Sequence, residues 1–360
     1  MVATPRQLMW WRFRRHRIAV VGTVVVILFY LVALFCEVVA PLNPDEIDGA
    51  HKYVPPMAIS FVNADGQFAF RPGVYGLKPH RDPNTLQLTY EPDPSQWYPI
   101  YFFTTGPEYQ LWGIIPLSVH LVGLGPNSDQ AFFLLGTDRL GRDMFSRLVY
   151  AARISLSIGL VGVTLSLLFG IILGGISGLF GGTSDTIIQR VIEFIRSMPQ
   201  IPLWLALAAA MPPQWPPQYV YFGITVILSL IGWTGLARVV RGKFLSLREE
   251  DFVMAARFSG SSEMRIIWRH MVPSFLSHII ATITLAIPSM ILSETALSFL
   301  GLGLRPPVVS WGVLLQDAQN VQTVAIYPWL LYPGIAVVLV ILAFNFMGDG
   351  LRDAADPYGR

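Results

Sequence analysis

The 360-residue sequence has few charged residues and almost no cysteine. Charged side chains make up 13% of the chain against 53% for apolar ones, and the mean hydropathy is +0.52. A soluble domain carries about 25% charged residues, so this composition predicts a membrane protein. The formal net charge of +2 is too small to indicate a nucleic-acid partner. The single cysteine, Cys36, excludes an internal disulfide and is interpreted as a small buried hydrophobe.

Motifs for nucleotide binding and for hydrolysis are also missing. The segment 235–244 only partly matches a phosphate-binding loop, because Ala237 stands where glycine is needed and Phe244 where serine or threonine is needed. No H-E-x-x-H or G-x-S-x-G segment occurs, and no two histidines are spaced four residues apart. We therefore expect no catalytic residues, no cofactor, no metal site and no enzymatic activity in this chain.

The N-terminal region joins a basic segment to an apolar run. Residues 18–36 are uncharged for 19 residues, enough to cross about 30 Å of hydrocarbon and longer than the core of a signal peptide. The pair Arg14 and Arg15 therefore precedes a retained span and not a cleaved leader. We expect residues 1–17 to be cytoplasmic and residues 18–40 to form transmembrane helix 1. The arginines expected on the cytoplasmic side are Arg6, Arg12, Arg14, Arg15 and Arg17.

Further apolar runs predict transmembrane helices 2–6 within a core over residues 151–347. Four of the runs contain no Asp, Glu, Lys or Arg: 154–180, 219–236, 275–293 and 325–347. The run 187–211 begins with charged residues and contains Pro199 and Pro202, so we expect its start to be kinked. Six spans return residues 348–360 to the cytoplasm. Basic residues also cluster around residues 240–274, which favours a cytoplasmic loop there.

Residues 41–150 form a long segment between the first two spans that we expect to lie outside the membrane. Within it, residues 41–130 are rich in proline, tyrosine and tryptophan and show little helical periodicity. This pattern predicts short strands and turns, and the recurring aromatic residues favour an ordered external subdomain over disorder. The expected fold class is therefore an all-α polytopic membrane protein with six transmembrane helices and a large external loop subdomain.

The stretch DFVMAARFSGSSEMRIIWRHMVPSF, residues 251–275, predicts two short helices in the cytoplasmic loop. Gly260 supplies the conformation that ends the first helix, and Ser261 or Ser262 caps the second. On the first helix Phe252, Ala255, Ala256 and Ser259 share one side. On the second, an apolar stripe with helical spacing is expected from Met264, Ile267, Trp268 and Met271. Such a pair makes a knob that fits a cleft on a soluble partner.

The same stretch resembles the coupling loop of ABC importer permeases. The match is carried by an Ala-Ala pair, a glycine four residues later and a proline thirteen residues beyond it: Ala255, Ala256, Gly260 and Pro273. Met254 departs from the pattern, since many such motifs carry Glu there. The resemblance implies contact with an ATPase through Phe252, Ala255, Ala256, Gly260, Met264, Arg265, Ile267, Trp268, His270, Met271 and Pro273. A basic interfacial helix on anionic lipid headgroups is the alternative interpretation.

Three other segments are similar to the peptide-type (oligopeptide, dipeptide and nickel) permeases of this family. They are LLGTDRLGRDMFSRLVYAARISL, SETALSFLGLGL and GDGLRDAADP. The resemblance implies a bacterial inner-membrane permease that pairs with a second homologous permease. Further implied partners are two ABC ATPase subunits, an external substrate-binding protein and a peptide substrate. An oligosaccharide or another small solute remains an alternative cargo, and a passive channel, a scaffold or a membrane enzyme is a rival from another class.

Further residues were singled out for structural or transport roles. Asp138, Arg142 and Asp143 are expected on an amphipathic helix at the outer membrane surface, with a direct substrate role as the alternative. Gly170, Gly174 and Gly178 form a ridge for close helix packing, against a helix of this chain or of another permease. Glu294 is an acid deep in an apolar run, so we expect it to face protein or an aqueous path, in a structural or a substrate-contacting role.

Overall fold

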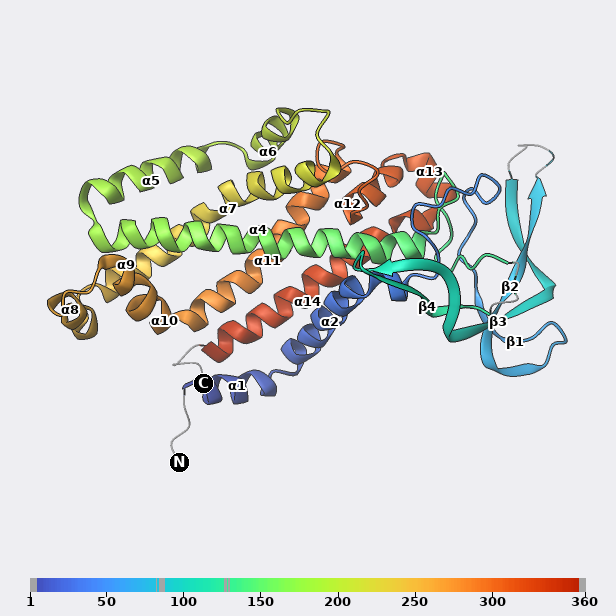
Figure 1. The fold of residues 1–360 in the computed structure, drawn as a ribbon, viewed down its shortest axis with the longest axis horizontal. Coiled ribbons are helices and arrows are strands. Elements are labelled where there is room, and N and C mark those ends of the chain that lie inside the picture. Colours follow the sequence, from blue (N-terminus) through green and yellow to red (C-terminus); the bar gives the residue numbers. More distant parts are fainter. Residues whose placement is uncertain (1–4, 82, 84–87, 126–127, 129, 356–360) are drawn as a thin grey trace. The chain divides into compact units, whose positions relative to one another are not determined.

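The computed structural model describes residues 5–81, 83, 88–125, 128 and 130–355. The ends of the two expected cytoplasmic termini, 1–4 and 356–360, lie outside the described residues. Helices make up most of the chain, and its strands form one antiparallel sheet (Figure 1). The chain divides into two compact units, which are described separately. The first contains residues 1–28, 156–304 and 337–360, and the second contains residues 29–155 and 305–336.

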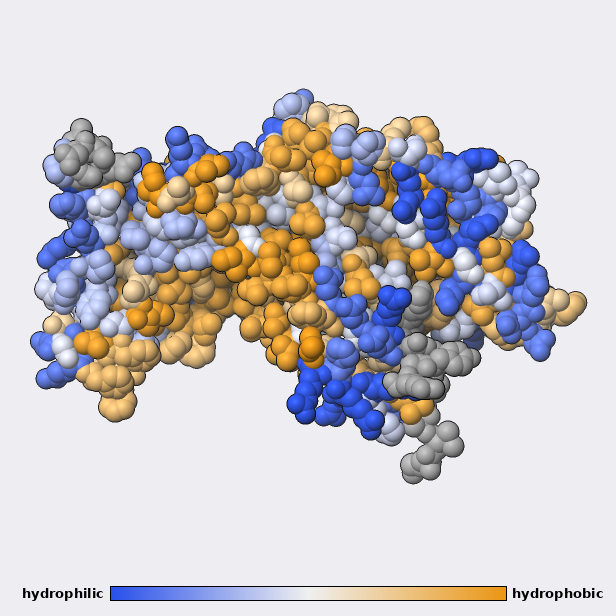
Figure 2. Space-filling model, turned by 180° about the vertical axis from the view of Figure 1, so that it is seen from behind, coloured by the Kyte–Doolittle hydropathy of each residue, from blue (hydrophilic) through white to orange (hydrophobic). Residues whose placement is uncertain are grey.

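Five helices of the described chain are long and apolar enough to cross a membrane. They are α2 (Arg17–Leu34), α4 (Met144–Phe180), α7 (Pro217–Leu247), α11 (Leu276–Phe299) and α14 (Tyr332–Ala355), the last preceded by the 3₁₀ turn η3 (Pro328–Leu331). Hydrophobic side chains form much of the surface that Figure 2 shows. The structure is therefore that of a mostly helical, polytopic membrane protein. The one remaining expected span, residues 187–211, differs.

The expected third span, residues 187–211, is split into two helices. Helix α5 (Gly182–Ser197) ends two residues before Pro199, and α6 (Gln200–Ala209) begins directly after it. Met198 is extended, with φ −86° and ψ 140°, because proline disfavours the helical conformation of the residue before it. The kink expected from Pro199 and Pro202 is therefore a full break. At 10 residues, α6 is shorter than the about 20 needed to span the hydrocarbon.

The glycine ridge packs α4 against α7 of the same chain. A Cβ atom on Gly174 would lie 2.5 Å from the carbonyl oxygen of Ala237. Cβ atoms on Gly170 and Gly178 would lie 2.7 Å from the Cβ atoms of Leu236 and Phe244. These distances are shorter than any van der Waals contact, so only glycine permits this approach. The ridge thus serves packing within the chain, an assignment that the spacing alone left open.

The second unit contains the sheet, which makes the fold-class label all-α too narrow. Its strands are β1 (Ile59–Val62), β2 (Phe68–Arg81), β3 (Leu88–Leu111) and β4 (Ile115–Leu124), paired in that order. Strand β3 pairs with β2 up to Pro99 and with β4 from Ile100 onward. Pro94 and Pro107 fall where the register shifts, because proline cannot donate to a ladder. Two of the strands, β2 and β3, are thus longer than expected, and β3 changes its partner along its length.

Short helical elements complete both units. In the first they are α1 (Pro5–Arg15), α8 (Asp251–Phe258), α9 (Glu263–Arg265), the π-helical η1 (Ile266–Met271) and α10 (Val272–Ser274). In the second they are α3 (Cys36–Val39), α12 (Trp311–Leu314), the 3₁₀ turn η2 (Leu315–Gln319) and α13 (Val321–Ile326). A buried cluster that includes Val54, Val74, Ile100 and Phe133 forms the core beneath the sheet. The segment that contains the sheet therefore has a hydrophobic core of its own.

Candidate functional site

Residues 251–274, which we call the helix pair, form the candidate site. Helix α8 ends in a Schellman motif, in which the Gly260 amide donates to the Arg257 carbonyl at 2.9 Å and the Ser261 amide donates to the Ala256 carbonyl at 3.1 Å. Gly260 has φ +74°, the left-handed conformation that glycine adopts without strain. The expected helix break at this glycine is confirmed.

The second half of the helix pair begins with the expected serine cap, and its backbone then changes from an α-helix to the wider π-helix. The Ser262 side chain accepts from the Arg265 amide at 3.4 Å. From Ile266 to Met271 the backbone is π-helical, so side chains there do not repeat with the spacing of an α-helix. The expected apolar stripe is therefore only half right. Ile267 and Met271 are buried, whereas Met264 and Trp268 are exposed.

The buried face of the helix pair rests on a hydrophobic cluster. Val253 and Ala256 of α8 and Ile266, Ile267 and Met271 of the π-helical turn all belong to it. It also contains residues of the long helices: Ile171, Leu179, Val240, Phe244, Phe275 and Ile279. Because these side chains are close-packed, the helix pair is fixed to α4, α7 and α11 and does not hang as a loose loop.

The outer face of the helix pair carries large apolar side chains in water-accessible positions. They are Phe252, Met254, Phe258, Met264 and Trp268, and Phe258 is 85% exposed. Arg265 and Arg269 are exposed beside them. Of the remaining singled-out residues, Ala255, Gly260 and Pro273 are exposed, His270 is half-buried and Ala256 is buried. An apolar face with basic neighbours on a rigid base suits a protein partner better than water.

The sequence did not identify Phe258 as a contact residue, and it marked Met254 only as a departure from the family pattern. Both lie on α8, whose stripe was expected on the Phe252 side. The signal that identifies Phe258 is its place directly before the Ser-Gly pair that ends the helix. The residues that follow Phe258 are small, so no large side chain next to it in the sequence shields it from solvent.

Glu294 lies inside the protein, on α11. Its side chain is fully buried, and its Oε1 accepts a hydrogen bond from the Ser298 hydroxyl at 2.8 Å. The same hydroxyl accepts from the Leu304 amide at 3.0 Å. These contacts hold the chain that follows the end of α11, as a structural acid would.

The expected amphipathic helix containing Asp138, Arg142 and Asp143 is wrong. Helix α4 begins only at Met144. The residues before it form a turn, since Gly136 and Gly141 have φ +78° and +79°. Two left-handed positions so close together prevent a helix. Asp138 and Asp143 are buried rather than lipid-exposed.

This turn is instead a buried polar network. The Asp138 carboxylate accepts from the Arg142 Nε at 2.7 Å and from the Leu140 amide at 2.8 Å. Asp143 caps α4 by accepting from the Ser146 amide at 2.7 Å. Burial raises the pKa of Asp143 to about 6. Arg139, in the same turn, pairs with Asp317 at 3.2 Å.

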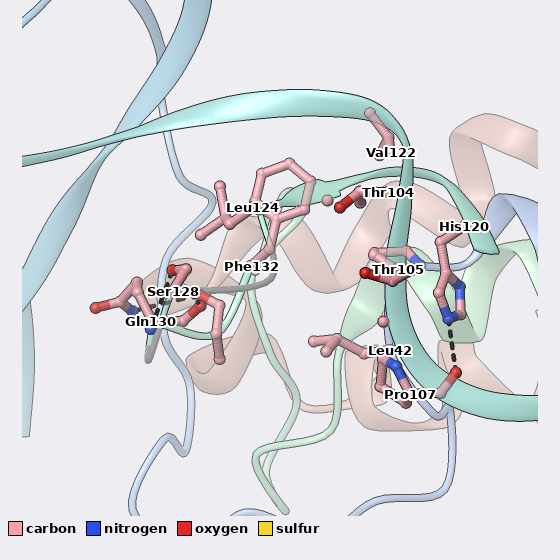
Figure 3. Close-up of a pocket in the computed structure, with 15 residues that line it drawn as sticks. Leu42, Thr104, Thr105, Pro107, His120, Val122, Leu124, Ser128, Gln130 and Phe132 are labelled. Atoms are coloured by element: carbon pink, nitrogen blue, oxygen red, sulfur yellow. Dashed lines mark hydrogen bonds between the residues drawn. The ribbon is translucent and has the colours of Figure 1, made fainter. Parts of the chain in front are cut away.

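A small cavity lies at the base of the sheet (Figure 3). It has a volume of about 200 Å³ and is lined by residues that include Leu42, Thr105, His120 and Phe132. Ligand pockets usually measure about 300–1,000 Å³, so this cavity is too small for a peptide. The Nε2 atom of His120 lies 2.9 Å from the Pro107 carbonyl oxygen, and this contact links the two strands of the β3–β4 hairpin.

Two family models match the sequence. One describes a binding-protein-dependent transport system inner membrane component and matches residues 167–358. The other describes the N-terminal TM domain of oligopeptide transport permease C and matches residues 4–56. The helix pair, the glycine ridge and Glu294 all lie within the first match.

Curated relatives agree with these models. The dipeptide transport system permease protein DppC of Alkalihalophilus pseudofirmus is 41% identical over 65% of this chain and 73% of its own length. DppC of Bacillus subtilis is 37% identical over 70% of this chain and 76% of its own length. The oligopeptide transport system permease protein OppC of Bacillus subtilis is 38% identical over 64% of this chain and 73% of its own length.

A solved structure of the MetNI methionine ABC transporter aligns with a TM-score of 0.45 and 18% identity, over 59% of this chain and 97% of that one. The family assignment rests on the family models and the relatives. The chain therefore belongs to the family of binding-protein-dependent transport system inner membrane components, and it is a membrane transport permease rather than an enzyme.

Proposed function

We propose that this chain is a permease subunit of an ATP-driven peptide importer and forms half of its translocation pathway. The names of the relatives, which are dipeptide and oligopeptide permeases, support the cargo class. The other half of the pathway is a second homologous permease, and an external substrate-binding protein delivers the peptide. Two ATPase subunits supply the energy, since the sequence contains no phosphate-binding loop.

The helix pair is the part that receives the ATPase. The observation that carries this proposal is the contrast between its two faces, with Ile267 and Met271 buried and Phe258 and Trp268 exposed. The exposed face offers an apolar contact to the partner. The buried face passes a displacement of the pair to α4, α7 and α11 as a rigid-body movement, because a packed core does not deform gradually.

The test replaces exposed residues of the helix pair and leaves its base intact. In the variant Phe258→Asp with Trp268→Asp, we expect normal membrane insertion but loss of ATPase subunits from the purified complex. Phe70→Asp is the matched control, because Phe70 is 95% exposed on β2, outside the helix pair. Retention of the full complement of ATPase by the double variant, at the level of the control, contradicts the proposal.

The membrane topology of the proposal has six spans, with α5 and α6 together forming the third. The sheet then lies outside the cell and the helix pair lies in the cytoplasm. Cysteines introduced at Pro94 and Ser262, both exposed, test this arrangement. An impermeant thiol reagent added to intact cells should label the first and not the second. The reverse pattern overturns the topology and the coupling role together.

The external sheet has a role in substrate delivery in this proposal. Its support is the sheet's own hydrophobic core, which includes Val74 and Ile100. Replacing residues 59–124 by a short Gly-Ser linker should preserve assembly and basal ATP hydrolysis but abolish stimulation by the loaded binding protein. Normal transport by that deletion variant contradicts the role.

An oligosaccharide or another small solute is the alternative cargo, because the binding protein sets much of the selectivity. The peptide assignment is tested by identifying the molecule that co-purifies with the binding protein. A bound peptide supports the assignment, and a bound sugar contradicts it while leaving the coupling role intact.

A further inference from the structure

The turn of the β3–β4 hairpin has an unusual composition. The segment Trp112–Val119, WGIIPLSV, contains no charged residue, and neither do the residues from Tyr109 to Leu111 that precede it. The β1–β2 turn of the same sheet has the sequence NADG and is closed by hydrogen bonds to the Asn63 side chain. A water-exposed turn normally contains such polar residues and glycine, as the β1–β2 turn does. The uncharged, apolar composition of the β3–β4 turn therefore requires an explanation.

The geometry of the turn also disfavours the residue found there. Trp112 and Gly113 have φ +54° and +73°, as in the two-residue turns that favour asparagine, aspartate or glycine at the first position. A bulky residue with positive φ is strained. Something outside the hairpin must therefore hold Trp112 in this conformation.

The end of α2 holds it. The Trp112 indole Nε1 donates to the carbonyl of Leu34, the last residue of α2, at 2.8 Å. The Trp112 amide donates to Glu37 Oε1 at 3.3 Å, and the indole packs on Phe35 with ring centroids 5.7 Å apart. A helix end leaves carbonyl groups without intrahelical partners, and the Leu34 carbonyl accepts from both Trp112 and Arg153, whose Nη2 lies at 3.0 Å. The turn is thus fixed against the end of a candidate membrane span.

Two further contacts keep the hairpin in this place. Glu37 also accepts from Arg153 of α4, at 2.6 Å to each of two guanidinium nitrogens. His120 of β4 is buried and contacts the carbonyl oxygen of Ala40, at the end of α3, through Nδ1. The orientation of the turn is therefore set by polar contacts on both sides.

Several other side chains of the hairpin are apolar and exposed. Ile114 is 80% exposed, and Ile115, Leu117 and Val119 are also exposed. On α2, Leu31 and Leu34 are exposed beside the turn's attachment point. The apolar surface of the hairpin thus continues an apolar surface that belongs to a membrane-spanning helix.

We propose that the tip of the β3–β4 hairpin, Trp112–Leu117, inserts into the boundary between lipid headgroups and acyl chains next to α2. Three observations favour lipid over a protein partner: the contact with the last residue of a span, the tryptophan at that level, and the absence of charge along the tip. Tryptophan is enriched at membrane interfaces because one end of its ring is apolar and the other donates a hydrogen bond. The proposal does not depend on which side of the membrane the sheet occupies.

A spin label at Ile114 tests the proposal in the full chain. The variant Ile114→Cys is made in a Cys36→Ala background and reconstituted into vesicles of phosphatidylcholine and phosphatidylglycerol. Collisions of the label with oxygen, which concentrates in lipid, are compared with collisions with a water-soluble nickel chelate. We expect the ratio of oxygen to nickel collisions to be several-fold higher than for Phe70→Cys in the same sheet.

Two results overturn the proposal. A label at Ile114 that meets the nickel chelate as often as the label at Phe70 lies in water. A label shielded from both oxygen and nickel is covered by protein. Leu117→Cys gives a second, independent position on the same surface, so a folding failure of one variant leaves the test intact. The readout is separate from ATPase binding and transport, so its failure is distinguishable from failure of the proposed function.

Discussion

The helix pair and the β3–β4 hairpin both expose apolar side chains beside a glycine turn, but they are fixed in opposite ways. Gly260 and Gly113 have nearly equal φ values, +74° and +73°. The helix pair rests on a buried apolar cluster that includes Val253, Ile267 and Phe244. The hairpin is attached by hydrogen bonds from Trp112 and by the charged residue Glu37.

The difference fits the role that we propose for each element. An apolar base is insensitive to pH and transmits displacement, as a part that carries mechanical coupling needs. A polar attachment is directional, because hydrogen bonds weaken steeply with angle, so it sets the orientation of a tip. The comparison leads to four predictions, from the largest expected effect to the smallest.

The apolar base should be the most sensitive point of the helix pair. Ile267→Ala removes a side chain that is 1% exposed, which costs about 2–5 kcal/mol by lost burial and the cavity left behind. Hydrogen exchange of residues 251–274 should become faster, while exchange in the sheet stays unchanged. Met264→Ala is the control on the exposed face and should have little effect. Equal effects of the two variants mean that the base does not hold the helix pair.

The stability of the second unit, which contains Asp143, should depend on pH. Burial raises the pKa of Asp143 from 3.8 to about 6, so the folded state holds this proton more tightly than the unfolded chain. The resulting stabilisation is fully present below about pH 4 and is lost as pH rises to about 6, a change of about 3 kcal/mol. Asp143→Asn, which keeps the acceptor that caps α4, should remove this pH dependence.

The readout for Asp143 is thermal unfolding of the purified protein at pH 4.5 and pH 7, compared between the wild type and the asparagine variant. The hydrogen exchange of the helix pair serves as an internal control, since the buried cluster on which it rests consists of hydrophobic residues. An unchanged pH dependence in the variant contradicts the assignment to Asp143.

The polar attachment of the hairpin should depend on the charge of Glu37. Glu37→Gln keeps the shape of the side chain but removes the ion pair with Arg153, which lies 2.6 Å away. Loss of a hydrogen bond between charged groups costs about 1–3 kcal/mol. The label at Ile114 should become more mobile, while ATPase binding stays unchanged. A change in ATPase binding without a change in label mobility reverses the expected division of roles.

The exposed face of the helix pair should matter least for stability. Phe258→Ser removes a side chain that is 85% exposed, so the unfolding free energy should change by no more than about 0.5 kcal/mol. ATPase retention should nevertheless fall. A large loss of stability in this variant means that Phe258 packs on the protein and is not a free contact surface.

Some of these features follow from local sequence. Long uncharged runs predict membrane spans because hydrocarbon accepts only apolar side chains. The break at Gly260 and the cap at Ser262 were predictable because helix ends use few residue types. The peptide-type permease motifs likewise pointed to the family that the relatives confirm.

Other features depend on contacts between residues far apart in the chain. The spacing around Asp138 suits a helix, yet the residues form a turn because Thr137 bonds to the backbone of His51 and Val54. The apolar stripe of the helix pair was half right because the backbone from Ile266 to Met271 is π-helical, and its buried side chains share one cluster with Phe244. Local preference is worth a few tenths of a kcal/mol per residue, so such tertiary contacts override it.

Sequence alone thus determined the membrane class, the family, most of the spans and the position of the helix pair, because each depends on residue type within a short window. Tertiary structure decided the long sheet, the partner of the glycine ridge and the attachment of Trp112 to Leu34. The glycine ridge and the Trp112 attachment join segments that are separated by tens of residues, and residue type does not indicate which distant backbone group lies within contact distance. In the sheet, the packing decided how far each strand extends and where β3 changes partner.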